Sequence, residues 1–337
     1  MHVFVCEFVT GGGFAGAPLP ESLCREGDMM LQALVKDLAE LPQIELVAAR
    51  DGRLPDPGLP CTLVRIGESE DPWAAWRRIM ADADAVWPIA PETDGLLERL
   101  STLVCERGRR LLGSPPAAIR LAASKRKTAA QLAAHGIAAV PTLPLLSALA
   151  DGLPPSNVGW VVKPDDGAGS EDTLLFYNAA DIGSWAASRR DIARFAIQPY
   201  LPGAAASLSL LCCDGQVALL SCNSQDVCIE GGRFHYRGGV VGGAEDRRAV
   251  YEPLAARIAT ALPDLWGHAG IDLVEASDGP VVLEINPRLT TSYVGLRRAL
   301  GANPAAPVLR LLEADLSAIA IPQPVRPQLV RTDAAAP

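Results

Sequence analysis

Lysine is scarce in this sequence compared with arginine. The 337 residues contain 30 lysines and arginines, and only four of these are lysine. They are Lys36, Lys125, Lys127 and Lys163. Because arginine and lysine are nearly equivalent on a solvated surface, a coding bias explains most of this imbalance. A site that needs a compact ammonium group does not accept a planar guanidinium, however. The four lysines are therefore candidates for functional positions.

An excess of positive charge and a long apolar run are also absent. The formal net charge is -9 and the pI is near 5.1, which excludes a broad basic surface for nucleic acid. No apolar run reaches the roughly 18 residues of a membrane span. Residues 1–9 lack the basic start and apolar stretch of a secretory signal. We predict a cytoplasmic protein that acts on small molecules, with no nucleic-acid or membrane partner. A homodimer remains open.

Cysteine pairs for zinc and a histidine triad for nucleophilic catalysis are absent too. The eight cysteines form no C-x-x-C pair and have no histidine at zinc-ligand spacing. They are typical of small core residues in a reducing compartment. The four histidines form no recognisable catalytic set. The chemistry must therefore come from other residues.

The first third of the chain alternates between strand and helix patterns. Buried strands are predicted for residues 3–9, 44–49 and 84–90, and helices for 29–40 and 93–107. This alternation predicts an α/β domain with a parallel sheet. Gly113-Ser-Pro-Pro116 breaks the pattern, so we place the end of an N-terminal β/α domain at residue 113.

The rest of the chain has the texture of an α+β domain with an antiparallel sheet. Helices are predicted at 118–121, 125–135 and 250–262. Short strands are predicted at 160–163, 173–177, 195–200, 206–213 and 217–223, followed by a hairpin over 270–286. We divide this part into segments 114–197 and 198–320, and we expect 321–337 to be a loose, disordered tail.

Gly11-Gly-Gly13-Phe-Ala-Gly16 matches the G-x-G-x-x-G pattern of dinucleotide-binding proteins. Pro18 and Pro20 follow it, so the helix that should cap the pyrophosphate is missing. Nicotinamide or flavin binding is therefore disfavoured. A flexible glycine loop that closes over a substrate is preferred, with Gly12 and Gly13 near that substrate.

Acidic and amide side chains gather on one hairpin. Glu284 and Asn286 are two residues apart on a strand and share a face. A three-residue loop at 277–279 would place Asp272 opposite Glu284, whereas a two-residue loop would place it opposite Ile285. Two opposed carboxylates need a cation between them, and oxygen ligands suit Mg²⁺. The alternative is a polar strand that faces solvent.

The hairpin ends in Glu284-Ile-Asn-Pro-Arg288. With Gly270-Ile-Asp272, this pattern resembles the ATP-grasp superfamily over residues 113–315. The resemblance implies an ATP-grasp fold preceded by a pre-ATP-grasp β/α domain. It also implies that Asp272, Glu284 and Asn286 bind Mg²⁺ or Mn²⁺ and that Arg288 contacts the transferring phosphoryl group.

Three further segments resemble the nucleotide-binding half of the same superfamily. The segment Ser124-Lys-Arg-Lys-Thr128 implies that Lys125 reaches the phosphates of ATP, as does Lys163 before a glycine-rich loop. The acidic residue that usually holds ribose is missing from 203–207, where Ser207 is a partial substitute. The implied loop residues are Gly167, Gly169 and Ser170, and the implied adenine-binding residues are Gln198, Tyr200 and Leu201.

The resemblance implies an ATP-dependent, ADP-forming carboxylate-amine ligase that works through an acyl phosphate. Residues 7–13 and 284–296 are similar to a branch that joins L-glutamate to tyramine in methanofuran biosynthesis, or to tyrosine for methylofuran. Another substrate pair, or a nucleotide-binding protein without activity, stays open. The loop 231–239 is either a mobile hairpin or a carboxylate site with Arg237. Thr290, Thr291, Ser292 and Tyr293 either line the acceptor pocket or cap the next helix.

Overall fold

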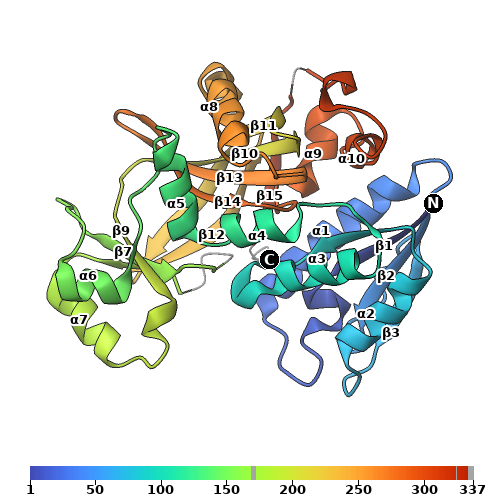
Figure 1. Cartoon of the computed structure of the whole chain (residues 1–337), viewed down its shortest axis with the longest axis horizontal. Coiled ribbons are helices and arrows are strands. Elements are labelled where there is room, and N and C mark those ends of the chain that lie inside the picture. Colours follow the sequence, from blue (N-terminus) through green and yellow to red (C-terminus); the bar gives the residue numbers. More distant parts are fainter. Residues whose placement is uncertain (168–171, 324, 333–337) are drawn as a thin grey trace.

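The computed structural model describes residues 1–167, 172–323 and 325–332 (Figure 1). Two sheets dominate it. The parallel sheet of the N-terminal domain (1–113) lies at one end of the molecule, and β7 and β9 with helices α6 and α7 lie at the other (Figure 1). We call predicted segments 114–197 and 198–320 the small lobe and the large lobe. No helix among the described residues is long and apolar enough to cross a membrane.

The N-terminal domain is a five-stranded parallel sheet in the order β3-β2-β1-β4-β5. The predicted α/β class is therefore confirmed. Its strands are β1 (His2–Glu7), β2 (Glu45–Asp51), β3 (Thr62–Ile66), β4 (Ala85–Ile89) and β5 (Arg110–Leu111), and its helices are α1 (Glu21–Ala39), α2 (Pro72–Ala81) and α3 (Leu96–Glu106). The strand order reverses between β1 and β4, and ligands bind at the carboxyl ends of strands at such a point.

Sequence patterns missed four features of this domain. Strands β3 and β5 and helix α2 were not predicted, and α1 begins at Glu21 rather than at 29. Pro20 directly precedes α1, a position where proline does not interrupt helical hydrogen bonds. Pro18 and Pro20, which exclude a helix directly after the glycines, therefore lie just before a helix that begins at Glu21.

The second sheet is antiparallel, in the order β14-β13-β10-β11-β12-β8-β7-β9-β6, and β15 pairs with β12. The predicted α+β texture is confirmed. Its strands are β6 (Leu143–Pro144), β7 (Trp160–Pro164), β8 (Leu174–Phe176), β9 (Phe195–Pro199), β10 (Ala204–Cys213), β11 (Gln216–Glu230), β12 (Arg233–Val241), β13 (Gly267–Ala276), β14 (Gly279–Asn286) and β15 (Gln328–Arg331). The helices that accompany it are α4 (Pro116–Ala122), α5 (Lys125–Ala134), α6 (Leu145–Asp151), α7 (Ala179–Ala187), α8 (Arg248–Ala261), α9 (Tyr293–Leu300) and α10 (Ala305–Arg310).

Two predicted irregular segments are ordered strands. Residues 233–241 form β12, which pairs with β11 over most of its length, so residues 231–239 begin with the turn of a β11–β12 hairpin, as one of the two predictions for this segment had it. Residues 328–331 form β15, so the prediction of a loose tail is wrong for them. In β15, Val330 is buried against the large lobe. One buried side chain and a ladder to β12 hold a segment that has no periodicity of its own.

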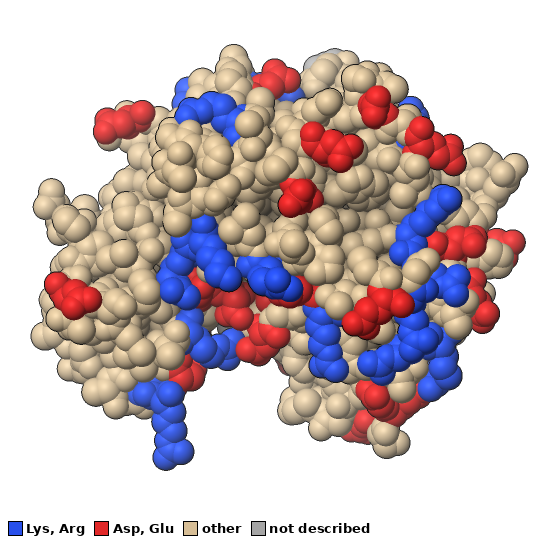
Figure 2. Space-filling model, in the orientation of Figure 1, with Lys and Arg blue, Asp and Glu red and all other residues tan. Residues whose placement is uncertain are grey.

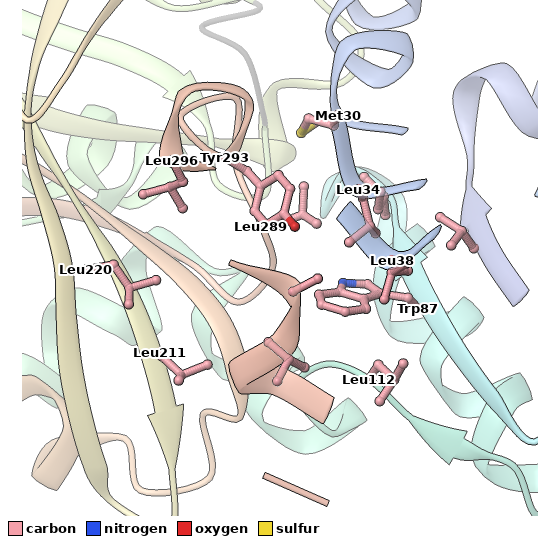
Figure 3. Packing of buried hydrophobic residues seen from close by; sticks show 14 of the residues in the cluster. Met30, Leu34, Leu38, Trp87, Leu112, Leu211, Leu220, Leu289, Tyr293 and Leu296 are labelled. Atoms are coloured by element: carbon pink, nitrogen blue, oxygen red, sulfur yellow. The ribbon is translucent and has the colours of Figure 1, made fainter. Parts of the chain in front are cut away.

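A shared hydrophobic core joins the N-terminal domain to the large lobe. Side chains from α1 and β4 pack against side chains from β10, β11 and α9 (Figure 3). At its edge the buried carboxylate of Asp37 accepts hydrogen bonds from the Tyr293 hydroxyl at 2.9 Å and from Arg297 Nη1 at 2.8 Å. This junction fixes the N-terminal domain relative to the strands of the large lobe.

We expect Tyr293→Phe to lower the free energy of unfolding by about 1 to 3 kcal/mol, because it removes a hydrogen bond to a buried carboxylate. Chemical denaturation measures the change. Tyr177→Phe is the matched control, since Tyr177 is 68% exposed and its hydroxyl faces solvent. An unchanged unfolding free energy for Tyr293→Phe would show that Asp37 does not depend on this donor.

Candidate active site

A cavity of about 590 Å³ opens where the two lobes meet the N-terminal domain. Its size is typical of a small-molecule site. Figure 2 shows acidic and basic side chains gathered in the hollow between the small lobe and the N-terminal domain. Glu7 at the end of β1 and Ile89 at the end of β4 line the cavity, so it includes the point where the order of the parallel sheet reverses.

The β13–β14 hairpin places Asp272 directly opposite Glu284, as predicted. The route to this register differs from the prediction. Ala276 pairs with Gly279, so the turn has two residues, and Gly279 takes a φ of 118°. A bulge in β14 inserts Leu283 as an extra residue between the two halves of the ladder. The bulge restores the predicted pairing that a two-residue turn would otherwise shift by one.

The bulge changes where the apolar side chains of β14 point. In a regular strand Leu283 would face away from its neighbour Glu284, but Leu283 lines the cavity. Val282 takes its place in the core beside Ile285. The strand therefore presents one large apolar side chain next to its acidic and amide groups.

Glu284 is the meeting point of two lysines. Its Oε2 lies 3.2 Å from Lys125 Nζ and 3.8 Å from Lys163 Nζ. Burial alone would raise the pKa of Glu284, but the two ammonium groups lower it. Burial lowers the pKa of Lys163 to about 8, against the opposing attraction of Glu284. Three groups from separate parts of the sequence thus form one charged cluster in the cavity.

Asp272 is half-buried beside Glu284 but has no cation of its own among the described ion pairs. Asn286 Nδ2 donates to its Oδ2 at 2.9 Å, and Gln225 Nε2 donates to its Oδ1 at 2.8 Å. Burial and the charge of Glu284 raise the pKa of Asp272. This raised pKa marks a place where a bound cation would relieve the electrostatic cost of two adjacent carboxylates.

The donor set on the hairpin fits a hard divalent cation. No cluster of three His, Cys, Asp or Glu side chains occurs in the part of the chain that the structure describes. The set is therefore two carboxylates and one amide oxygen, and all of them line the cavity. Mg²⁺ commonly takes a few protein oxygens and completes its shell with phosphate and water. The predicted ligands Asp272, Glu284 and Asn286 are brought together.

Lys125 is held in place by the loop that follows β7, the strand that carries Lys163. Lys125 Nζ donates to the carbonyl of Gly167 at 2.6 Å, and Lys125 N donates to the carbonyl of Asp165 at 3.0 Å. The carboxylate of Asp165 accepts from Ser124 Oγ at 2.6 Å. Lys125, Lys163 and Gly167 line the cavity. The predicted loop residues Gly169 and Ser170 lie outside the described residues.

The predicted adenine-binding residues Gln198, Tyr200 and Leu201 also line the cavity. The side chain of Gln198 donates to Thr142 Oγ1 at 2.8 Å, so it serves the packing of the small lobe. Ser207 lies at the cavity opposite Asp272 in the β10–β13 ladder. This is the residue that the sequence offered in place of the missing ribose carboxylate.

Arg288 lines the cavity and is paired with a carboxylate that sequence patterns did not identify. Its Nη2 donates to Oε2 of Glu92 at 2.9 Å. Glu92 comes just after β4 in the N-terminal domain, 196 residues earlier in the chain. Residues beyond the carboxyl end of a parallel strand are often functional, so the position of Glu92 could have marked it as a candidate. Its pairing with Arg288 depends on how the two domains pack and cannot be read from the sequence.

The substrate side of the cavity was predicted only in part. Thr290, Thr291 and Ser292 line it, and Ser292 makes no side-chain cap to α9. Tyr293 does not line it, because its ring is buried in the core between the domains. Arg237 does not line it either, because its guanidinium pairs with Glu230. The lining includes three residues that were missed, Glu7, Glu26 and Tyr236.

The glycine turn after β1 packs inside the N-terminal domain. Gly12 and Gly13 were predicted to lie near a substrate, and neither is among the residues that line this cavity. A Cβ on Gly12 would lie 2.8 Å from Ile66, and one on Gly13 would lie 2.5 Å from Phe8. Close packing therefore requires these glycines. The turn instead supplies donors to the cavity residue Glu7, from Thr10 N at 2.5 Å and Thr10 Oγ1 at 2.6 Å.

Comparisons with known proteins match both parts of the chain. A family model described as an ATP-grasp domain matches residues 122–292, and one described as a pre ATP-grasp 3 domain matches residues 44–119. Tyramine–L-glutamate ligase of Methanocaldococcus jannaschii is 24% identical over 296 residues, which cover 86% of this chain and 83% of the relative.

Solved structures have the same fold. An ATP-grasp superfamily protein of Archaeoglobus fulgidus matches with a TM-score of 0.71 and 26% identity, over 98% of this chain and 92% of the other. An L-amino acid ligase of Bacillus licheniformis matches with a TM-score of 0.65 and 17% identity, over 94% and 75%. Because the ATP-grasp model spans more than half of the 337 residues, the chain belongs to the ATP-grasp family.

Proposed function

We propose that this chain is an ATP- and Mg²⁺-dependent carboxylate-amine ligase. The observation that carries the proposal is the cluster in which Glu284 meets Lys125 and Lys163 beside Asp272, in a cavity that Arg288 also lines. Phosphoryl transfer needs positioning and charge neutralisation more than a nucleophilic side chain. This cluster offers both.

The reaction would proceed in two steps. A carboxylate oxygen of the first substrate attacks the γ-phosphorus of ATP, and the bond to the β-phosphate oxygen breaks to release ADP. The amine nitrogen of the second substrate then attacks the acyl carbon, and inorganic phosphate leaves as the amide forms. The proton that the amine loses passes to phosphate or to solvent. No side chain is covalently modified.

Each charged residue has a role in these steps. Lys125 and Lys163 would hold the phosphates, and Arg288 would balance charge on the transferring phosphoryl group. Asp272, Glu284 and Asn286 would hold Mg²⁺, which supplies further neutralisation of the phosphate charge when bound. The adenine would lie against Leu201 and the bulged Leu283. The ribose has no acidic partner in 203–207 and would rely on Ser207.

The substrates that we propose are L-glutamate and tyramine or tyrosine, in a methanofuran or methylofuran type of pathway. The name of the Methanocaldococcus relative supports this pair. The cavity supports an amine that carries an apolar body, since Glu7 and Glu26 line it together with Leu23, Met30 and Tyr236. Burial raises the pKa of Glu7 to about 7 despite the donors from Thr10.

The direct test is incubation of the protein with ATP, Mg²⁺, L-glutamate and either tyramine or tyrosine. We expect ADP release and an amide of the matching mass. Amide formation only with another amino acid and amine would support the ligase activity and would refute the proposed substrate pair. Tight ATP binding with no product from a broad panel of pairs would support the non-catalytic alternative instead.

We expect Glu284→Gln to lower kcat by roughly 10² to 10³, because it removes an anionic metal ligand and the group that places both lysines. The assay is steady-state ADP release over a range of Mg²⁺ concentrations. Asp278→Asn, which removes a charge from the exposed turn of the same hairpin, should leave the rate unchanged. Equal rates for Glu284→Gln and the wild type would refute the metal assignment.

We expect Lys163→Arg to lower kcat by about 10²-fold although the charge is kept. Lys163 is only 8% exposed, and a planar guanidinium does not reproduce the position of a compact ammonium group. Lys36→Arg is the matched control, because Lys36 is exposed on α1, and it should be silent. Full activity of Lys163→Arg would mean that the retained lysine carries no mechanistic information.

A further inference from the structure

Glu92 is a buried carboxylate of the N-terminal domain that faces a cation of the large lobe. It is 5% exposed, and the side chain of Arg288 is 13% exposed. Arg288 Nε lies 2.9 Å from Glu92 Oε1, and Nη2 donates to Oε2 at 2.9 Å. Glu92 does not line the cavity that Arg288 lines. It therefore touches the arginine from behind, away from the substrates.

The contacts of Arg288 leave one edge of its guanidinium toward the cavity. The Nε and Nη2 side faces Glu92, and Nη1 donates to the carbonyl of Leu289 at 3.2 Å. A guanidinium has five N–H groups in a fixed plane. The Nε–H makes an ion-pair contact with Glu92 but no hydrogen bond, and the described hydrogen bonds leave one N–H on Nη1 and one on Nη2 unused. These two N–H groups, the free fork of Arg288, can match two oxygens of a phosphoryl group. The plane of the fork is set by Glu92.

A buried arginine also needs its counter-charge. The carboxylates of Glu92, Glu26 and Glu284 are the anionic groups that act on its charge. Of these carboxylates, Glu92 is the one that contacts the guanidinium in the described ion pairs. Without Glu92, the guanidinium of Arg288 would be attracted to Glu26 or Glu284, which line the cavity. This attraction would turn its two free N–H groups away from the position that Glu92 gives them.

The loop that carries Glu92 also contacts the small lobe. The backbone N–H of Asp94 donates to Asp166 Oδ2 at 2.8 Å, and the carboxylate of Asp94 lies 3.1 Å from Arg194. Asp94 and Gly95 both have positive φ, at 55° and 68°, which fixes the turn of the loop. One short segment of the N-terminal domain therefore contacts the loop after Lys163 and the arginine after β14.

We propose that Glu92 is a positioning residue that aims the free fork of Arg288 at the transferring phosphoryl group. The proposal rests on the proposed function, in which Arg288 acts on that group. It assigns the N-terminal domain a part in phosphoryl transfer, although none of the metal or phosphate ligands belongs to it. Glu92 acts through Arg288 and does not touch ATP.

The test compares Glu92→Gln with Arg288→Ala and with the double variant. We expect Glu92→Gln to lower kcat on the order of 10²-fold, as a small displacement of an aligned group does. It should add no further loss in the Arg288→Ala background, because the two residues act as a unit. A further loss of tenfold or more in the double variant would overturn the proposal.

A binding measurement distinguishes an effect of Glu92 on the orientation of Arg288 from an effect on the stability of the fold. Calorimetry gives the dissociation constants of ADP and of the imido analogue of ATP. We expect the wild type to bind the analogue more tightly than ADP. Both Glu92→Gln and Arg288→Ala should lose most of this preference. Asp94→Asn removes an exposed charge from the same loop and tolerates the left-handed backbone, so it should keep both kcat and preference. A lowered melting temperature with wild-type preference and kcat would overturn the proposal.

Two further outcomes are distinguishable. If the wild type forms no amide with any substrate pair, the ligase proposal fails, but the nucleotide preference still tests Glu92. If Glu92→Gln does not fold, Glu92→Asp keeps the charge and moves it back by one methylene group. It should lower kcat and preference by at least about tenfold, and wild-type values for Glu92→Asp would overturn the proposal.

Discussion

The contact of one carboxylate with two ammonium groups organises the whole cavity. Glu284 belongs to the large lobe, whereas Lys125 and Lys163 belong to the small lobe. Like charges from α5 and β7 would repel one another in a buried place, and Glu284 makes their approach possible. Under the proposed function, phosphates that enter the cavity would offer the lysines an alternative partner and would free Glu284 for a metal ion. The same three groups thus hold the lobes together and prepare the site.

The N-terminal domain completes this arrangement from the other side. The contact of Asp37 with Tyr293 and Arg297 fixes α1 against α9, and α9 begins directly after the residues that line the cavity. Glu92 then reaches Arg288 from the end of β4. Because parallel strands end at one edge of their sheet, the same edge supplies Glu7 to the cavity. A domain that holds no phosphate ligand therefore shapes the substrate end of the site.

Sequence patterns were sufficient for the parts of the site that depend on short spacing. Glu284 and Asn286 share a face because strands alternate, and Asp272 joins them because a hairpin pairs residues near one another in the chain. The predicted pairing is present, although the two-residue turn and the bulge at Leu283 were not foreseen. The shorter turn shifts the register by one residue and the bulge shifts it back, so Asp272 still pairs with Glu284. The bulge changes the position of Leu283, which lines the cavity instead of the core.

The missed and misplaced residues depend on contacts between distant segments. No local pattern indicates that Glu92 meets Arg288 or that Tyr293 donates to Asp37. The glycine turn shows a further limit of pattern reading. Glycine permits positive φ and also close packing, and these two uses look identical in a sequence. At Gly12 both apply, because its φ is 96° and Ile66 lies against it.

The two kinds of cation in the cavity are matched to different geometries. Lys125 Nζ contacts a carbonyl and a carboxylate from separate elements, which a compact ammonium group can do because its three donors diverge. Arg288 faces both oxygens of a single carboxylate, an arrangement that suits a planar fork. Arginine abundance on the surface therefore says little about function. In the cavity, by contrast, each cation has acceptors whose arrangement suits its own donors.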